Sequence, residues 1–141
     1  MQGFFQCFFN LYRPLVSRLN ELLSKYGLSY SLWQVILYLK INGPSTLVDI
    51  ASHYNIEKPS ITRRVHLLEE KLLVKAVTGG RDRREKVIQL TEKAENLYAI
   101  CRERITELEY LAMTGIPEEE QRTVFEVLPK IKNNIQEKED R

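Results

Sequence analysis

The residue types best suited to chemistry gather between residues 57 and 91. On a helix of about 100° per residue, four aliphatic side chains of this stretch fall on one line: Ile61, Val65, Leu68 and Leu72. The opposite side carries Pro59, Thr62, Arg63, His66 and Glu70, and Ser60 and Arg64 lie on its shoulders. Hydroxyl and guanidinium groups donate to phosphates and base edges, and an arginine pairs bidentately with guanine. The pattern favours a helix that reads the major groove of DNA; a solvated helix face beside a core stripe is the alternative.

A second charged group lies at the tip of an expected β-hairpin. Residues 74–78 and 86–90 are rich in β-forming side chains, and the two glycines at 79 and 80 predict a tight turn between them. The tip consists of Arg81, Asp82, Arg83 and Arg84. A narrow minor groove has an enhanced negative potential that attracts an inserted arginine. We therefore expect Arg83 or Arg84 to reach DNA, with Lys86 among the contacts, and a charged loop without a partner is the other interpretation.

The positive charge is concentrated in this region. Residues 57–93 hold ten Lys/Arg against six Asp/Glu, a net charge of +4. The whole chain has a net charge of +2, so the remaining residues sum to −2. A local basic surface on a chain that is nearly neutral elsewhere is typical of a nucleic-acid contact region.

The preceding residues predict a helix-turn-helix. Ser29, Tyr30 and Ser31 start a helix over residues 32–41, which Gly43 and Pro44 end. Ser45 or Thr46 can cap a third helix over residues 47–53, and residues 54–56 form the turn into the polar helix. The hydroxyl of Thr46 and the nearby amides could also hold a phosphate, and simple capping explains the residue equally well.

These features resemble the multiple-antibiotic-resistance regulator (MarR) family of winged-helix transcription factors. The most specific part of the resemblance is Asp82-Arg83-Arg84 with Leu90-Thr91-Glu92 downstream. The family usually has glycine where Leu72 stands and another glycine near Ala94, and a left-handed cap is costly for leucine. The resemblance implies a mainly α fold with a small β-wing, formed as a winged helix-turn-helix domain plus a helical dimerisation layer.

The terminal regions are expected to supply that layer. We predict one unit over residues 1–141, with a DNA-binding lobe at 29–91 and dimerisation helices at 1–28 and 92–141. The first helix has two adjacent apolar stripes, and Pro14 should kink or break it. Thr91 should cap a long helix to about residue 114, and a last helix should start at Pro117, bend at Pro129 and fray from residue 136.

Composition excludes several other classes. The hydrophobic content of 43% and the charged content of 28% are ordinary for a soluble domain. Two distant cysteines, Cys7 and Cys101, give no disulfide framework and fit a reducing cytoplasm. The sequence has no apolar run of membrane-spanning length. His53 and His66 belong to no metal-binding spacing, and we find no catalytic constellation, so we expect no metal, no cofactor and no enzyme activity.

Two regulatory routes follow from the resemblance. A pocket for a small aromatic ligand would lie between the dimer layer and the DNA-binding lobe, lined by Tyr12, Tyr30, Trp33 and Tyr38, although an aromatic core explains these residues too. The alternative is peroxide sensing through Cys7, which lies among phenylalanines about two residues from the expected position. Apolar burial would raise the pKa of such a thiol and make it inert.

The sequence thus predicts a homodimer that binds double-stranded DNA at a pseudo-palindromic operator, represses transcription and is released by a small molecule. A winged-helix module in which the arginines meet an acidic protein is the competing class. It predicts neither a dimer nor a preference for duplex DNA.

Overall fold

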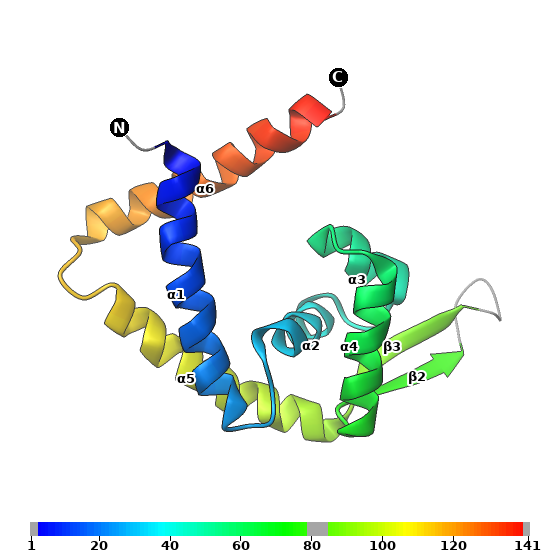
Figure 1. Ribbon diagram of the computed structural model, residues 1–141. Helices are drawn as coiled ribbons and strands as arrows, with labels where there is room; N and C mark the ends of the chain where they lie inside the picture. Colours follow the sequence, from blue (N-terminus) through cyan, green and yellow to red (C-terminus); the bar gives the residue numbers. More distant parts are fainter. Residues whose placement is uncertain (1–2, 79–84, 140–141) are drawn as a thin grey trace. The chain divides into compact units, whose positions relative to one another are not determined.

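The computed structural model describes residues 3–78 and 85–139, so the expected wing-tip contacts Arg81, Asp82, Arg83 and Arg84 lie outside the described residues. The described chain is mainly helical with one small sheet, which confirms the predicted fold class (Figure 1). In chain order its elements are α1 (Phe4–Ser24), α2 (Tyr30–Asn42), β1 (Ser45–Thr46), α3 (Leu47–Tyr54), α4 (Lys58–Glu70), β2 (Val74–Thr78), β3 (Lys86–Leu90), α5 (Glu92–Ala112) and α6 (Glu118–Glu139).

The chain divides into two compact units, Met1–Ile105 and Thr106–Arg141. The first unit contains α1 to α4, the sheet and most of α5. The second contains the end of α5, the turn at Gly115 and α6. The buried hydrophobic cluster lies entirely in the first unit.

The core of the first unit is built around α2. Five of its side chains are buried, on more than one side of the helix: Leu32, Trp33, Val35, Ile36 and Leu39. The helix begins where the serine cluster predicts, because the Leu32 amide donates to the Ser29 hydroxyl at 3.3 Å. Three members of the predicted stripe on α4 are buried in the same cluster: Ile61, Val65 and Leu68.

The placement of Leu72 in that stripe is wrong. Leu72 lies beyond the end of α4 in the left-handed conformation, with φ of 61° and 68% of its surface exposed. The Leu72 amide donates to Glu69 and the Leu73 amide to Leu68, both at 2.9 Å, which is the Schellman pattern of helix ends. Leu73 takes the core position instead and is 2% exposed. The chain therefore uses the family's glycine conformation at this position without a glycine.

The sheet has three antiparallel strands in the order β1-β3-β2. The hairpin strands β2 and β3 have the bounds that the sequence predicts, with Val74 opposite Leu90 and Thr78 opposite Lys86. They project from the helices as an arm (Figure 1). The short strand β1 was not expected: Ser45 pairs with Ile88 and Thr46 with Val87. A two-residue strand between helices has no sequence period from which to predict it.

The two helices with a proline in their interior are continuous. Pro14 lies inside α1 and Pro129 inside α6, so the break that was expected at Pro14 as the alternative to a kink is wrong. Each proline removes one backbone donor, and both prolines are exposed, where water can satisfy the carbonyl left without a partner. The expected fraying from residue 136 is also wrong, since α6 is helical to Glu139.

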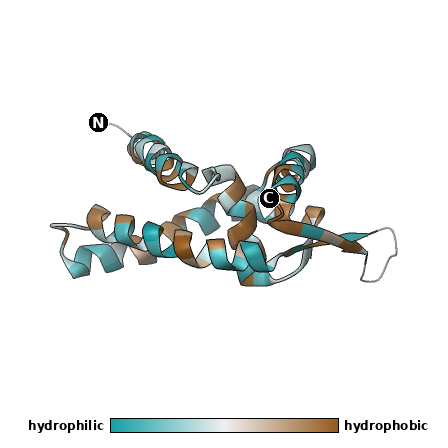
Figure 2. Ribbon diagram, turned by 90° about the horizontal axis from the view of Figure 1, so that it is seen from below, coloured by the Kyte–Doolittle hydropathy of each residue, from teal (hydrophilic) through white to brown (hydrophobic). Residues whose placement is uncertain are grey.

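Large apolar side chains remain exposed on the terminal helices. On α1 they are Phe4, Phe5, Phe8, Phe9, Leu11, Tyr12 and Leu15. On α6 they are Val124, Phe125, Val127, Leu128 and Ile135. Figure 2, in which apolar residues are brown, shows hydrophobic and hydrophilic residues alternating along the helices. Among the described residues no helix is long and apolar enough to cross a membrane.

The conformation of Leu72 gives a testable prediction. The left-handed conformation costs a leucine about 1–2 kcal/mol, and a glycine at the same position avoids this cost. The greater freedom of glycine in the unfolded chain offsets about 0.5–1 kcal/mol of the gain. We expect Leu72→Gly to raise the free energy of unfolding by about 0.5–1 kcal/mol in urea titrations. The neighbouring Leu73→Ala should instead lower it by about 2–5 kcal/mol, because that side chain is buried. A Leu72→Gly protein less stable than the parent would contradict this account.

Candidate nucleic-acid interface

The helix-turn-helix is formed by α3 and α4. Thr46 caps α3 in a reciprocal capping box, in which its hydroxyl accepts from the Asp49 amide and the Asp49 carboxylate accepts from the Thr46 amide, both at 3.1 Å. Asn55 ends α3 in the left-handed conformation with φ of 54°. Three residues then lead into α4. The predicted capping role of Thr46 is confirmed, and its hydroxyl hydrogen is still available to a phosphate.

The polar side of α4 faces away from the core. Pro59, Arg63 and His66 are exposed, whereas Ser60 and Thr62 are half-buried. The Thr62 hydroxyl donates to the Lys58 carbonyl at 3.0 Å, one turn back along the helix. Within residues 3–78 and 85–139, Arg63 makes no hydrogen bond or ion pair, so its guanidinium has all its donors available.

Arg64 behaves differently from its neighbour. Its Nη1 atom donates to the Gln34 Oε1 atom at 2.9 Å and to the Ser31 carbonyl at 3.3 Å. Both acceptors belong to α2. The sequence placed Arg64 on the shoulder of the DNA-facing side, but in the structure this side chain is directed towards its own protein.

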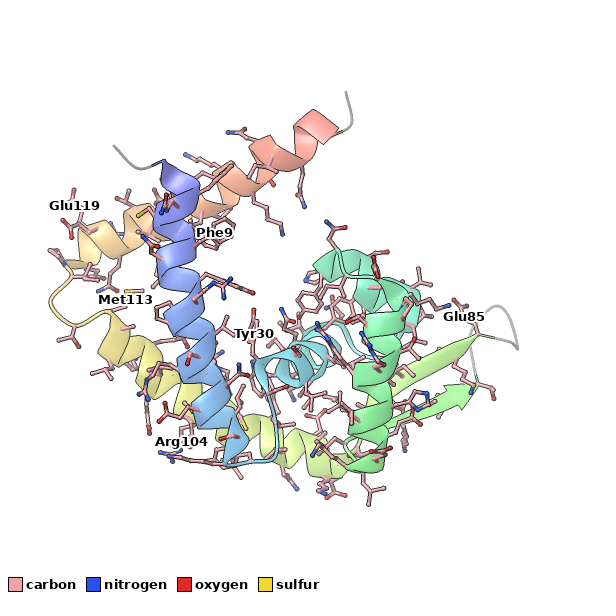
Figure 3. The ribbon with its side chains drawn as sticks, in the orientation of Figure 1. Phe9, Tyr30, Glu85, Arg104, Met113 and Glu119 are labelled. Carbon is pink, nitrogen blue, oxygen red and sulfur yellow. The ribbon has the colours of Figure 1, made fainter. Side chains whose placement is uncertain are left out.

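A small hollow lies beside the start of α3 and the outer end of the hairpin, where β3 begins. It has a volume of about 220 Å³, and Glu85, which is labelled in Figure 3, belongs to its rim. Its lining consists of Thr46, Leu47, Val48, Lys58, Glu85 and Lys86. The two lysines and the threonine bring phosphate-binding groups together. Sequence reasoning missed Lys58, although a lysine at the first position of a polar helix was a usable signal.

The four aromatic residues of the predicted ligand pocket have different surroundings in the described chain. Trp33 is buried and stacks on Tyr98, with ring centroids 5.3 Å apart and planes 6° apart. Tyr38 packs against the rings of His53 and Tyr54. The core interpretation therefore describes these two residues.

Tyr12 and Tyr30 lie elsewhere in the first unit. Tyr12 lines an open groove of about 770 Å³ along α1, on the same helix as Phe9 (Figure 3). The groove is lined by Phe9, Tyr12, Arg13, Val16, Ser17 and Asn20. Tyr30 is in the first turn of α2 (Figure 3), and its amide donates to the Asn20 side chain at 2.7 Å. A ligand site at this groove stays a prediction.

The two cysteines have different environments. Cys7 is exposed on α1 and does not line the groove. In the described chain, Cys7 therefore lacks the apolar burial that would make its thiol unreactive. Its redox role stays a prediction. Cys101 is buried on α5 as part of the hydrophobic core, and burial raises the pKa of its thiol to about 11.

Tyr54 ties α3 to α2. Its hydroxyl donates to the Gln34 carbonyl at 2.7 Å. Burial raises the pKa of Tyr54 to about 12, with smaller contributions from Tyr30 and Tyr38. The hydroxyl is therefore protonated, and available as a donor, at any physiological pH.

Metal-binding groups do not cluster in the part of the chain that the structure describes. Residues 3–78 and 85–139 contain no set of three or more His, Cys, Asp or Glu side chains arranged to hold a metal ion. His53 packs in the aromatic group with Tyr38 and Tyr54, and His66 is exposed on α4.

A helix-turn-helix followed by an antiparallel hairpin, with an exposed arginine on the outer side of its second helix, is the arrangement of winged-helix DNA-binding proteins. Residues 26–85, which include α2 to β2 and end just before β3, match the family model described as the MarR family. The chain belongs to the MarR family of winged helix-turn-helix transcription factors, and it is a DNA-binding transcriptional regulator.

The similarity extends beyond the matched region. The crystal structure of transcriptional regulator PA3341 is 31% identical, covers 96% of this chain and 99% of its own, and superposes with a TM-score of 0.85. A Staphylococcus aureus MarR is 26% identical with a TM-score of 0.84 and covers 95% and 91% of the two chains. The Bacillus subtilis regulator YwoH is 40% identical over 86 residues, or 61% of this chain and 62% of its own.

The raised pKa of Tyr54 predicts a pH dependence of stability. Because its pKa of about 12 in the folded protein lies above the ordinary value of 10.0, the unfolded chain loses the proton first as pH rises. Stability that is fully present below pH 10 is then lost towards pH 12. We expect Tyr54→Phe to flatten this decline in urea titrations, and to cost about 0.5–1.5 kcal/mol at pH 8 through the lost hydrogen bond.

Tyr98→Phe is the matched control, since the hydroxyl of Tyr98 makes no hydrogen bond within the described ranges. Cys101 titrates in the same window, but it is present in both variants and cancels in the comparison. Equal alkaline slopes for the two variants would show that Tyr54 does not carry the effect.

Proposed function

We propose that this protein is a homodimeric repressor that binds a pseudo-palindromic operator and is released by a small aromatic ligand. The observation that carries the proposal is the exposed guanidinium of Arg63, which has no partner within residues 3–78 and 85–139 and lies on the side of α4 opposite its buried stripe. A helix held this way can enter a major groove with its donors unpaired. In a dimer the two recognition helices would occupy successive major grooves about 34 Å apart, or about 10 bp.

The DNA-binding lobe of this proposal is residues 29–91. From α4 it uses Pro59, Ser60, Thr62, Arg63 and His66, and from the wing Lys86 with the tip residues Arg81, Asp82, Arg83 and Arg84. Thr46 and Lys58 join through the hollow beside the start of β3. Groove contacts from α4 would read bases, whereas the basic groups of the wing would neutralise phosphates or enter the minor groove.

The dimer is proposed to form through residues 1–28 and 92–141. Its support is the number of large apolar side chains that α1 and α6 leave exposed in the single chain. Contiguous exposed apolar surface on a soluble protein marks an interaction site, since its burial is favoured by about 25 cal/mol per Å².

Release by a ligand is supported by one relative and one feature. The structure of the Staphylococcus aureus MarR contains salicylate and kanamycin. In this chain the groove on α1 offers Tyr12 and Phe9 for an aromatic ring and Arg13 for a carboxylate. Salicylate carries both groups, so it is the first compound to test.

Arg63→Ala tests the DNA contact. We expect the affinity for the intergenic DNA beside the protein's own gene to fall by about 1–3 kcal/mol, with relaxed base preference if Arg63 reads a guanine. Fluorescence anisotropy over a salt series, with unrelated duplex as competitor, measures both effects. Equal weakening on every sequence would make Arg63 a phosphate contact, and a wild-type protein indifferent to duplex DNA would overturn the repressor proposal.

Phe5→Lys tests the dimer. Phe5 is 60% exposed on α1, and loss of a buried phenylalanine from an interface costs about 1.5–3 kcal/mol, so the dimer dissociation constant should rise roughly 10- to 100-fold. Ile41→Lys is the control, because Ile41 is 70% exposed at the end of α2, outside the proposed layer. Light scattering over a concentration series gives the mass. Equal masses for the two variants at every concentration would remove α1 from the interface.

A further inference from the structure

Gln34 lies at the junction of three helices of the DNA-binding lobe. Its Oε1 atom accepts from Arg64 of α4 at 2.9 Å, and its Nε2 atom donates to the Tyr30 hydroxyl at 3.1 Å. Its backbone carbonyl accepts from the Tyr54 hydroxyl of α3 at 2.7 Å. The side-chain amide thus has a partner at each end. Because a guanidinium can only donate, Arg64 fixes which end of the amide faces α4.

The same line of hydrogen bonds continues to α1. The Tyr30 amide donates to the Asn20 Oδ1 atom at 2.7 Å, and Asn20 lines the groove on α1. Asn20, Tyr30, Gln34 and Arg64 therefore form one connected path from that groove to the recognition helix. Each of its links joins two different elements or successive turns of α2.

Arg64 and Arg63 are adjacent in sequence but differ in what they bind. Arg63 is exposed and makes no hydrogen bond or ion pair within the described ranges. Arg64 is half-buried, and its Nη1 atom gives both of its hydrogens to acceptors on α2. To turn towards a DNA base, Arg64 would have to give up both bonds and leave the Gln34 oxygen without this donor.

We propose that Gln34 is a positioning residue for DNA binding, which holds α4 at its working angle through Arg64, and that Arg64 acts inside the protein and not on DNA. The inference rests on the proposed function, since it concerns how the same recognition helix is presented. Apolar packing of the stripe on α4 resists separation of the helices but allows rotation and sliding. A directional bond between charged and neutral groups resists those motions as well.

The test is a double-mutant cycle on DNA affinity, using Arg64→Ala, Gln34→Leu and the double variant with the intergenic duplex. We expect each single change to weaken binding about tenfold and the loss in the double variant to be smaller than the sum of the two single losses, because both changes remove the hydrogen bond between Arg64 and Gln34. The slope of log affinity against log salt should stay that of the wild type. Arg63→Ala is the matched control, and as a phosphate contact it would reduce that slope by about 0.9.

The conservative variant Gln34→Glu keeps the acceptor for Arg64 and should bind DNA within about twofold of the wild type. If Gln34 acted only through its shape, the Gln34→Leu protein, whose new side chain is nearly isosteric, would bind DNA as tightly as the Gln34→Glu protein. A salt slope reduced by about 0.9 in Arg64→Ala, together with additive losses in the double variant, would overturn the proposal and make Arg64 a DNA contact.

Urea titrations of the wild type, Arg64→Ala, Gln34→Leu and the double variant separate this proposal from the proposed function. A non-additive loss of stability reports the Gln34–Arg64 interaction without DNA. If the wild type ignores duplex DNA while that coupling is present, the proposed function fails and the pair is purely structural. If the wild type binds DNA and the stability losses are additive, the positioning role alone is overturned.

Discussion

One constraint governs this lobe: α4 must pack one side against the core while its other side stays exposed. The buried side consists of Ile61, Val65 and Leu68, and burial of each such side chain is worth about 1.5–3 kcal/mol. Their partners come from α2, α3 and β2, and α2, which is buried on several sides, serves as the axis of the core. Because the apolar stripe and the hydrogen bonds of Arg64 hold α4 in place, its other side can stay exposed.

The same constraint fixes how the chain leaves α4. Leu73 and Val74 return to the core at once, which leaves a single residue for the change of direction. That residue is Leu72, and the left-handed conformation is the geometry that closes the helix in so short a space. The Thr91 hydroxyl then donates to the Leu72 carbonyl at 2.7 Å and accepts from the Ala94 amide at 3.2 Å. The end of α4, the end of the wing and the start of α5 therefore share one hydrogen-bonded point.

Sequence reasoning succeeded where a pattern repeats and failed where a single contact decides. Periodicity predicted the hairpin strands and the buried stripe on α4, because burial acts on every turn of a helix and every second residue of a strand. It misplaced Leu72, which continues the helical pattern one turn beyond the helix itself. It could not predict that Arg64 is bound within the protein while Arg63 is exposed. That difference comes from Gln34, which lies 30 residues from Arg64 in the chain.

The aromatic residues of α2 show why the lobe and the long helix α5 are coupled. Trp33 stacks on Tyr98 of α5 inside the core, and Lys40 lies over the outer side of the same ring while pairing with Glu95 at 2.6 Å. The ion pair raises the pKa of Lys40, but it is exposed, and solvent screens such pairs. The buried ring stack therefore sets the position of α5. Since α2 also meets α1 through Tyr30 and α4 through Gln34, it is the element that contacts both long helices and the recognition helix.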